Sequence, residues 1–413
     1  MKSTSEKMRL IALMLICNCI GCSLNGQRVS LSEYKSYSFV KDSLNVIKND
    51  SALFPFYEEL IKLKKDNVTI VSILHIGDSH LQADLLTALV RTKMQLTFGN
   101  AGRGLVVPLK VAKTNEPSNY VTSSTSVWQS KRCVFPNNPM PIGIGGVTIN
   151  SSESNASLNV KTFNTQDLDY SFNNATLFHQ NDTNNYTFSV QVEGKNSKSE
   201  KQNYSPFYNV YRFANSTNEI TFNASKQIEN QNQATIYGMS LENGKAGVLY
   251  HTVGVNGAQY QHFNKAIYFA EQSKYLHPNL IIISLGTNEG YDTNFDSAQF
   301  YKQIESLVYK LKYYNPSAAF ILTTPANSYY KGGYNSRLPI ITKTILSFAK
   351  DNNLATWDLE EIGGGSRSAY NWKKNGLLAR DGVHYIKSGY ELQGNLLQEA
   401  ILKSYNNYVV PKP

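Results

Sequence analysis

The sequence predicts an α/β fold, namely a three-layer sandwich around a five-stranded parallel sheet, interrupted by an inserted all-β domain. Near the N-terminus and again from residue 246 onward, apolar runs alternate with segments whose apolar residues recur at helical spacing. Between them, from about residue 105 to 240, Asn, Ser and Thr are abundant and apolar residues alternate with polar ones, as in a β-sandwich. With 413 residues the chain is also long for a single hydrophobic core.

The expected elements of the α/β part follow one another in regular order. Five buried strands are predicted at residues 69–76, 247–253, 280–285, 319–323 and 354–357. An amphipathic helix is predicted directly after Ser79, because Leu81, Leu85, Leu86, Leu89 and Val90 recur at helical spacing. Further helices are predicted at about 258–274, 296–313, 337–351 and from about 387.

The N-terminus has the features of an export signal. Lys2, Lys7 and Arg9 precede an apolar run at 10–16, which is too short to span a bilayer. The tripeptide 20–22 resembles a bacterial lipobox, with Cys22 as the lipidated residue. Residues 1–21 are therefore predicted to be a lipoprotein signal peptide, followed by a linker and helical lead-in at 22–66. The alternative is a cleaved secretory signal with incidental cysteines.

These features predict an exported, periplasmic lipoprotein of a bacterial cell envelope, held to a membrane by its lipid anchor. Three of the four cysteines, Cys17, Cys19 and Cys22, belong to the signal, which leaves Cys133 alone in the mature chain. Neither an intramolecular disulfide nor a thiolate-rich structural zinc site is then expected.

The charge balance narrows the classes of partner. The chain carries a formal net charge of +9, and residues 1–21 contribute +2 of it, which leaves +7 for the mature chain. This favours anionic surfaces such as phospholipid or cell-wall polymer. Nucleic acid is not an expected partner, because the protein is exported and contains no dense run of Lys and Arg. The sequence points to no particular protein partner.

The chemistry is expected at the first strand-to-helix turn. Gly77, Asp78 and Ser79 end an apolar run, and Ser79 stands where a helix is predicted to begin. A helix N-terminus offers free backbone N–H groups and a positive dipole end, which suit a nucleophilic serine and the oxyanion that its attack generates.

Four loops at the carboxyl ends of the predicted strands carry polar residues with matching chemistry. They are 77–80 (GDSH), 254–258 (GVNGA), 286–290 (GTNEG) and 381–384 (DGVH). His384 provides a base for the serine proton, and Asp381, three residues earlier, provides a carboxylate to orient that base. The N–H groups of Ser79 and Gly257 and the side-chain amide of Asn288 provide candidate donors to an oxyanion.

These four blocks, in this order, resemble those of the SGNH/GDSL hydrolase family. The resemblance covers about residues 69–98 and 246–405. It implies a discontinuous catalytic domain at 67–104 and 241–408, with the inserted domain at 105–240. It also implies that Ser79 is the nucleophile, that His384 and Asp381 complete a catalytic triad, and that Gly257 and Asn288 are oxyanion donors. Gly254 is the other candidate in the second block.

Within this family the chain is most similar to bacterial peptidoglycan O-acetylesterases, on the wording of the four blocks and the position of a carbohydrate-binding-module-like insertion. That similarity implies hydrolysis of O-acetyl esters at the C6 hydroxyl of N-acetylmuramic acid through an acyl-enzyme. It implies an O-acetylated glycan as partner and no cofactor or metal. Glu289 stands where the wider family usually has Asp, a change that we expect to leave the chemistry of Asn288 untouched.

Other functions use some of the same residues. The side chains His75, Asp78, His80, Asp84 and His384 could be metal ligands, although His75 lies within a strand and is expected to point away from the others. An O-acetyltransferase or an acetyl-xylan-type carbohydrate esterase would use the same triad. A non-catalytic glycan-binding lipoprotein is an alternative of a different class.

The role of four aromatic residues in the inserted domain can be interpreted in two ways. Trp128, Tyr170, Tyr186 and Tyr208 could stack on sugar rings, but aromatic residues that alternate along the strands of a sandwich usually belong to its core. We therefore assign no glycan-binding residues within 105–240.

Overall fold

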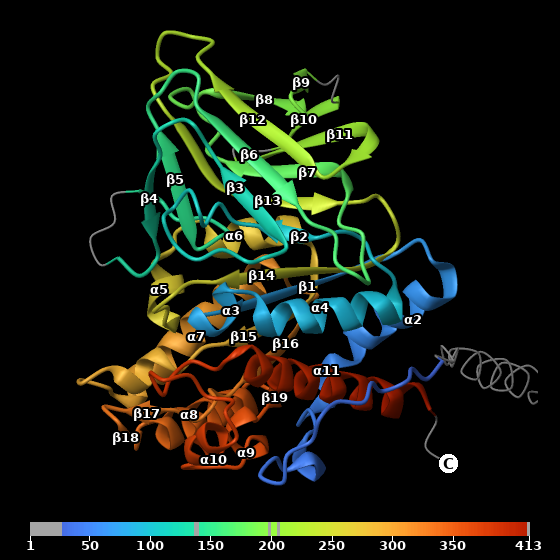
Figure 1. Cartoon of the computed structure of the whole chain (residues 1–413), viewed down its shortest axis with the longest axis vertical. Coiled ribbons are helices and arrows are strands. Elements are labelled where there is room, and N and C mark those ends of the chain that lie inside the picture. The colour runs from blue at the N-terminus through green and yellow to red at the C-terminus, as the bar shows by residue number, and fades with distance from the viewer. Residues whose placement is uncertain (1–26, 136–139, 197–199, 205–206, 411–413) are drawn as a thin grey trace, which may run out of the picture.

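A five-stranded parallel sheet forms the centre of the protein in the computed structural model (Figure 1). The structure describes residues 27–135, 140–196, 200–204 and 207–410. The strand order is β14 (Gly247–Gly254), β1 (Ile70–Gly77), β15 (Pro278–Ser284), β16 (Ala319–Thr323) and β19 (Ala355–Trp357). The predicted sheet is confirmed, and because every neighbouring pair is parallel, the carboxyl ends of all five strands meet at one edge.

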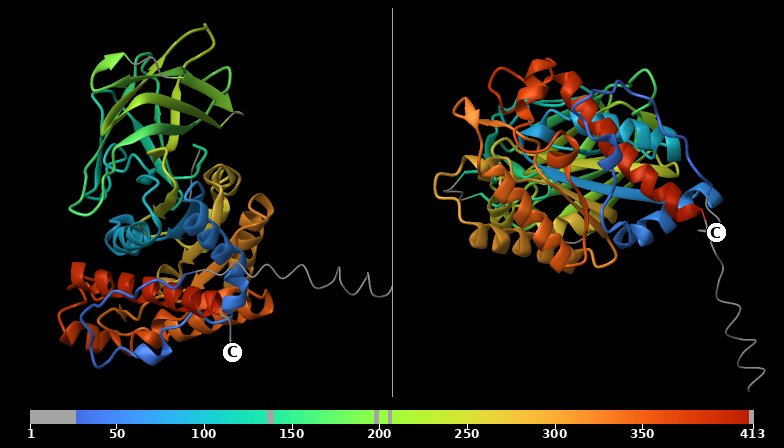
Figure 2. Two further views of the ribbon diagram at one scale, coloured as in Figure 1. Left: turned by 90° about the vertical axis from the view of Figure 1, so that its right-hand side faces the viewer. Right: turned by 90° about the horizontal axis from the view of Figure 1, so that it is seen from below.

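Helices cover both faces of this sheet (Figure 2). Val71 and Ile73 of β1 belong to the core on one face, and Leu74 and Ile76 to the core on the other, because successive side chains of a strand alternate. The first face is covered by α2 (Phe54–Asp66), α4 (Leu85–Phe98) and α11 (Lys387–Val409). The second is covered by α5 (Tyr260–Lys265), α6 (Phe269–Ser273), α7 (Ser297–Tyr314) and α8 (Leu338–Asp351).

The prediction of a single helix directly after Ser79 is wrong. The chain forms a short α3 (Ser79–Gln82) and then α4, with a break at Ala83 and Asp84. Asp84 adopts the left-handed backbone conformation, with φ of +58°. The apolar spacing continues through the break, so the periodicity did not reveal it. The physical reason is the buried carboxylate of Asp84, which accepts hydrogen bonds from Arg103, Asn119 and Thr252, all of them outside the predicted helix.

The helix predicted at 258–274 is also divided, into α5 and α6. Between them the backbone N–H of Tyr268 donates to the carbonyl of Ile142, at 3.0 Å. Ile142 belongs to the inserted segment, so a tertiary contact uses a donor that an unbroken helix would use internally. Of the other predicted helices, α7 and α8 begin and end within a few residues of their expected bounds, and α11 begins at its expected residue.

The chain between α4 and β14 forms two antiparallel sheets, which confirms the all-β insertion. One contains β10 (Glu200–Tyr204), β11 (Tyr208–Thr217), β7 (Phe172–His179), β13 (Ala234–Glu242), β5 (Val147–Ser151) and β4 (Gln129–Arg132), with β2 (Gly104–Val106) paired to β13. The other contains β3 (Tyr120–Ser123), β6 (Ser157–Thr162), β12 (Glu219–Ser225), β8 (Thr187–Val192) and β9 (Lys195–Asn196). The exact domain bounds given above stay a prediction.

Aromatic residues fill the space between these two sheets. Tyr211 of β11 contacts Phe222 of β12, with 5.7 Å between ring centroids. Trp128, Tyr170 and Tyr186 are each at most 7% exposed, so they belong to the core. Tyr208 packs against Tyr275, at 4.4 Å between centroids. The insertion therefore uses these rings for packing. Cys133 is buried and forms no disulfide within the described residues.

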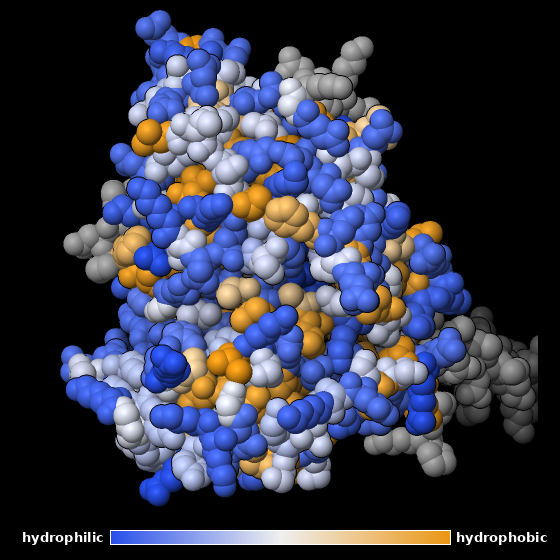
Figure 3. All heavy atoms as spheres, in the orientation of Figure 1, coloured by the Kyte–Doolittle hydropathy of each residue, from blue (hydrophilic) through white to orange (hydrophobic). Residues whose placement is uncertain are grey.

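The surface differs between the two parts of the molecule. The insertion, at the top of Figure 3, is largely hydrophilic, whereas apolar residues gather over α4 and α11 on the same face. A cavity of about 470 Å³ lies there, lined by Leu85, Ala88 and Leu89 of α4 and by Lys387 and Glu391 of α11. Ala83 lines this cavity as well as the one that contains Ser79.

A buried cluster of charges joins α4 to the insertion. The Asp84 carboxylate accepts hydrogen bonds from Arg91 and from Arg103, the latter at 3.1 Å, and all three side chains are at most 2% exposed. Thr87, Asn119 and Thr252 also donate to it. Burial alone would raise the pKa of Asp84, but the two guanidinium groups lower it to about 2.

We predict that Asp84→Asn lowers the free energy of unfolding by about 3 to 5 kcal/mol, because two buried arginines would lose their only carboxylate partner in this cluster. Urea denaturation checks this. The exposed Asp167→Asn, on the rim of the neighbouring cavity, serves as the control and should unfold like the wild type. A decrease of less than about 1 kcal/mol in the free energy of unfolding would contradict the conclusion that this cluster stabilises the fold.

Candidate active site

The turn after β1 places Ser79 at the first residue of α3. A Cβ at Gly77 would lie 2.5 Å from the Leu81 side chain and 2.8 Å from the Ser284 carbonyl, so only glycine fits there. Asp78 caps the helix, because its Oδ1 accepts the backbone N–H of His80 at 2.9 Å. The side chain of Ser79 is thereby fixed at the carboxyl edge of the sheet.

Three predicted side chains meet at this edge. His384 Nε2 lies 2.8 Å from Ser79 Oγ, and His384 Nδ1 lies 2.7 Å from Asp381 Oδ2. The other oxygen of Asp381 accepts the backbone N–H groups of Val383 and His384, at 2.8 and 2.9 Å. Gly382 has a φ of +74°, which the tight turn between acid and base requires. The order of contacts is therefore carboxylate, imidazole, hydroxyl.

The Asp381 carboxylate is stabilised in its ionised form. Partial burial raises its pKa, but the hydrogen bonds from the His384 ring and from the two backbone N–H groups outweigh burial and lower the pKa below its ordinary value. An ionised acceptor at Nδ1 holds the proton of the imidazole on that nitrogen. It leaves Nε2 free to accept the proton of Ser79.

The Ser79 cavity offers two backbone N–H groups that are available to donate a hydrogen bond to a ligand. Among the described residues, neither the N–H of Ser79 nor that of Gly257 donates to a protein acceptor. Gly257 has a φ of +81° and is exposed in the cavity. Gly254, the other candidate, is buried, and a Cβ there would lie 2.3 Å from the backbone nitrogen of Gln82. Its role is therefore close packing.

Asn288 lies in the same cavity, but its amide is already engaged. Asn288 Nδ2 donates to the Ala258 carbonyl at 2.9 Å and to Asp78 Oδ2 at 3.3 Å. The first bond joins the third block to the second. The second bond is long, so the hydrogen that Asn288 would offer to an oxyanion is the one that faces Asp78.

The cavity above Ser79 has a volume of about 590 Å³, which suits a small ligand. Ser79, Gly257, Asn288 and His384 line it. Asn256 and Val383, from the second and fourth blocks, also line it, and four residues outside the blocks complete the lining: Ala83, Asn115, Tyr291 and Tyr390. Asn115 belongs to the inserted segment, and no local pattern marked it.

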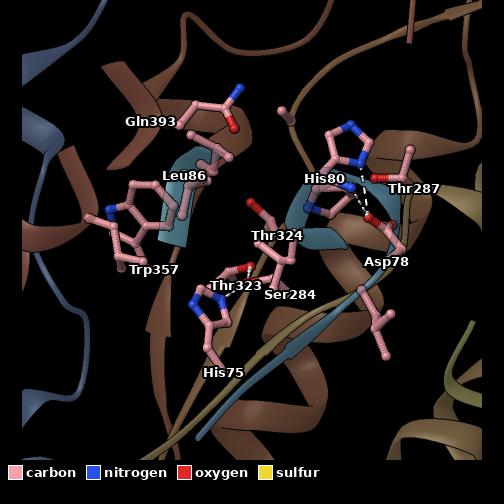
Figure 4. Close-up of a pocket in the computed structure, with 16 residues that line it drawn as sticks. His75, Asp78, His80, Leu86, Ser284, Thr287, Thr323, Thr324, Trp357 and Gln393 are labelled. Carbon is pink, nitrogen blue, oxygen red and sulfur yellow. Dashed lines mark hydrogen bonds and ion pairs between the residues drawn. The ribbon is translucent and has the colours of Figure 1, made fainter. Parts of the chain in front are cut away.

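The side chains considered as metal ligands have other partners. His75 is fully buried below the site, with Nδ1 2.7 Å from Tyr250 Oη and Nε2 2.7 Å from Ser284 Oγ. Figure 4 shows His75 pointing away from Asp78 and His80. Asp84 is bound by the two arginines. Burial lowers the pKa of His75 to about 3, so it is neutral. These side chains do not converge on one point.

His80 lies between two acceptors next to the candidate base. Its Nδ1 is 2.9 Å from Asp78 Oδ1 and its Nε2 is 3.2 Å from the Val383 carbonyl, so only the doubly protonated ring donates to both. Burial lowers its pKa, but Asp78 and the Val383 carbonyl outweigh that effect, and the pKa is raised. The ring centroids of His80 and His384 are 5.4 Å apart.

Glu289 is a buried acid behind the site. Its Oε1 accepts the backbone N–H of Tyr260 at 2.9 Å, which fixes the start of α5, and its Oε2 has no partner among the described residues. Burial, together with the nearby charge of Asp78, raises the pKa of Glu289 to about 8. Since Ala258 accepts from Asn288, Glu289 and Asn288 hold the same loop, the one that carries Gly257.

A comparison with protein-family profiles matches residues 73–397 to the GDSL-like lipase/acylhydrolases. The match covers most of the chain and all four blocks. The chain belongs to this family. It is accordingly a carboxylic ester hydrolase. A comparison with curated protein sequences found no match.

Several solved structures resemble this GDSL hydrolase. One described as a peptidoglycan O-acetylesterase has a TM-score of 0.73 at 23% identity, over 86% of this chain and 96% of that chain. A lipase/acylhydrolase from Enterococcus faecalis has a TM-score of 0.30 at 21% identity, over 40% of this chain and 80% of that one. An acetyl xylan esterase has a TM-score of 0.30 at 22% identity, over 37% of this chain and 81% of that one. The first likeness includes the inserted sheets and shows a shared fold.

We predict that Glu289→Gln stabilises this GDSL hydrolase increasingly between pH 5 and pH 8. An unfolded glutamate ionises at about pH 4.3, whereas Glu289 in the folded protein ionises at about pH 8, so rising pH favours the unfolded state over this interval. The gain should reach about 3 to 5 kcal/mol at pH 8 and be small at pH 5. Thermal unfolding at several pH values measures it.

The exposed Glu229→Gln is the matched control, and its effect should not change with pH. A Glu289→Gln variant whose stability relative to the wild type is the same at pH 5 and pH 8 would contradict the neutral, buried acid.

Proposed function

We propose that this hydrolase is a serine esterase that removes O-acetyl groups from a cell-wall glycan, with the C6 O-acetyl ester of N-acetylmuramic acid in peptidoglycan as its substrate. The observation that carries the proposal is the hydrogen-bonded series Asp381, His384, Ser79 at a helix N-terminus. Beside it lie the two unengaged N–H groups of Ser79 and Gly257.

The proposed reaction follows the order of these contacts. Ser79 Oγ attacks the acetyl carbonyl carbon while His384 Nε2 takes its proton, and Asp381 stabilises the resulting imidazolium. The carbonyl oxygen becomes an oxyanion that accepts from the N–H groups of Ser79 and Gly257, with Asn288 as the third donor. The imidazolium then protonates the departing sugar oxygen, which leaves acetyl-Ser79. Water, activated by His384, releases acetate and restores Ser79.

The choice of substrate is supported by two observations. The fold likeness to a protein described as a peptidoglycan O-acetylesterase extends over 86% of this chain, including the inserted sheets. The mature chain has an excess of basic residues, which favours contact with an anionic cell wall. The experiment must distinguish this function from three alternatives: an acetyltransferase, an acetyl-xylan esterase and a glycan-binding protein without catalytic activity.

We predict that the wild type releases acetate from O-acetylated sacculi, and much more slowly from acetylated xylan, with none from sacculi de-O-acetylated by mild base. Ser79→Ala and His384→Ala should lower kcat on an aryl acetate by at least about 10³-fold, because the nucleophile or its base is lost. Chromatography of released acetate and a colorimetric assay make the measurements.

Each alternative gives a different result. Faster release from xylan would favour the acetyl-xylan esterase, and acetyl transfer to a sugar in preference to water would favour the transferase. Wild-type-like turnover by either variant would remove the triad assignment, and an inactive wild type would favour the silent glycan-binding protein.

We also propose that the protein is attached to a bacterial membrane, facing the periplasm, through lipid on Cys22. Residues 1–26, which include Cys22, lie outside the described residues. In the part of the chain that the structure describes, no helix is long and apolar enough to cross a membrane. The proposal is supported by the basic, apolar and lipobox-like order of residues 2–22.

We predict that labelled palmitate is incorporated into the wild type and that Cys22→Ser loses both the label and the membrane fraction, because the thiol is the site of attachment. Cys19→Ser is the matched control and should keep both. Incorporation of the label into the Cys22→Ser protein would contradict the proposal that lipid is attached to Cys22.

A further inference from the structure

His80 is joined to the Asp381–His384 turn through a single peptide group. The carbonyl of that peptide belongs to Val383, and its oxygen lies 3.2 Å from His80 Nε2. The N–H of the same peptide belongs to His384 and donates to Asp381 Oδ1 at 2.9 Å. The peptide therefore accepts a hydrogen bond from His80 at one end and donates one to the Asp381 carboxylate at the other.

The other ring nitrogen of His80 is bound to the first strand-to-helix turn (Figure 4). His80 Nδ1 lies 2.9 Å from Asp78 Oδ1, which also accepts the backbone N–H of His80. Ser79 stands between these two residues, and its Oγ lies 2.8 Å from His384 Nε2. The two turns are thus connected twice, once by the contact between Ser79 and His384 and once by the His80 ring.

Both contacts of the His80 ring require it to donate. A carboxylate and a backbone carbonyl offer only acceptors, so the ring must carry a proton on each nitrogen to bond both. When this ring loses a proton, it keeps the one on Nδ1, because a hydrogen bond to a carboxylate is stronger than one to a neutral carbonyl. Deprotonation therefore removes the donor to Val383 and leaves the contact with Asp78.

The charged groups that face the His80 ring favour its doubly protonated form. Burial lowers the pKa of His80, but contact with Asp78, the hydrogen bond to the Val383 carbonyl and the charge of Asp381 together raise it above its ordinary value. Three further rings pack against it, those of His384, Tyr385 and Tyr390, with centroids 5.4, 6.2 and 5.9 Å away.

We propose that His80, as an imidazolium, is a positioning residue that holds the Asp381–His384 turn in place against Ser79. His80 is not among the described residues that line the Ser79 cavity, so it acts through Val383 and not on the substrate. Its hydrogen bond also polarises the shared peptide, which strengthens the bond from the N–H of that peptide to Asp381. This inference rests on the triad of the proposed function and adds a residue from outside it.

Two substitutions separate the contacts of the ring. The amide nitrogen of glutamine can occupy the place of histidine Nε2, so His80→Gln keeps a donor for Val383 and has no proton to lose. The amide nitrogen of asparagine can occupy the place of Nδ1, so His80→Asn keeps the contact with Asp78 and loses the donor to Val383. Both variants remove the charge, and they differ in the hydrogen bond to which we assign the positioning.

The test measures kcat and KM on an aryl acetate in a pH-stat between about pH 6 and about pH 10. Wild-type kcat should fall about tenfold on the alkaline side as His80 loses its proton, because the hydrogen bond to Val383 is then lost. His80→Asn should show a kcat about tenfold lower at the wild-type optimum, with KM close to that of the wild type. His80→Gln should stay within about threefold of the wild-type kcat at that optimum and show no alkaline fall.

His277→Asn is the matched control. His277 is exposed and precedes β15, at the edge of the sheet opposite to Ser79, and its φ of +48° suits asparagine. This variant should keep the wild-type pH profile. Thermal unfolding of each protein shows that the fold is retained. A merely structural role would lower the melting temperature of both His80 variants without separating their pH profiles.

Three results would overturn the inference: a His80→Asn protein with wild-type kcat, a His80→Gln protein whose kcat falls on the alkaline side as in the wild type, or a wild-type kcat that stays constant to about pH 10. Failure of the triad itself gives a different result, because Ser79→Ala or His384→Ala would then keep its turnover. Failure of this inference alone leaves both of those variants inactive.

Discussion

The position of Ser79 depends on a buried ion cluster. Asp84 interrupts the chain after α3 in a left-handed conformation, and its carboxylate is held by Arg91 and Arg103 out of contact with solvent. A buried charge is tolerated only when it is paired and hydrogen-bonded, so each member requires the others. Arg91 belongs to α4 and Arg103 precedes β2. The cluster therefore fixes the short helix that begins with Ser79 relative to both α4 and the insertion.

A second set of contacts extends this connection to the cavity. Gln82, at the end of α3, accepts from Asn256 and donates to Asn115, so it joins the first block, the second block and the inserted segment. The insertion packs Tyr211 and Phe222 between its two sheets and Tyr208 against Tyr275 of the α/β part. It also contributes Asn115 to the wall of the Ser79 cavity. The inserted segment therefore forms part of the wall of the cavity above Ser79, through the loop that carries Asn115.

Two carboxyl groups close to Ser79, those of Asp78 and Glu289, are respectively paired and neutral. Asp78 is compensated by His80 and by the amide of Asn288. Glu289, which has no cationic partner in the described part of the chain, is kept neutral by burial instead. This arrangement leaves Asp381 as the carboxylate that acts on His384. A new charge on an oxyanion can then be stabilised by the backbone N–H groups of Ser79 and Gly257, which donate to no acceptor among the described residues.

The sequence by itself determined the parallel sheet, the antiparallel insertion and the four loops. Strand and helix periods arise from near neighbours, and parallel strands necessarily bring their ends together. The short spacing of Asp381 and His384 likewise fixed their contact. Tertiary structure alone decided the break at Asp84, the place of Asn115 in the cavity and the burial of Glu289. These features depend on groups that are distant in the chain, and local periodicity carries no information about such partners.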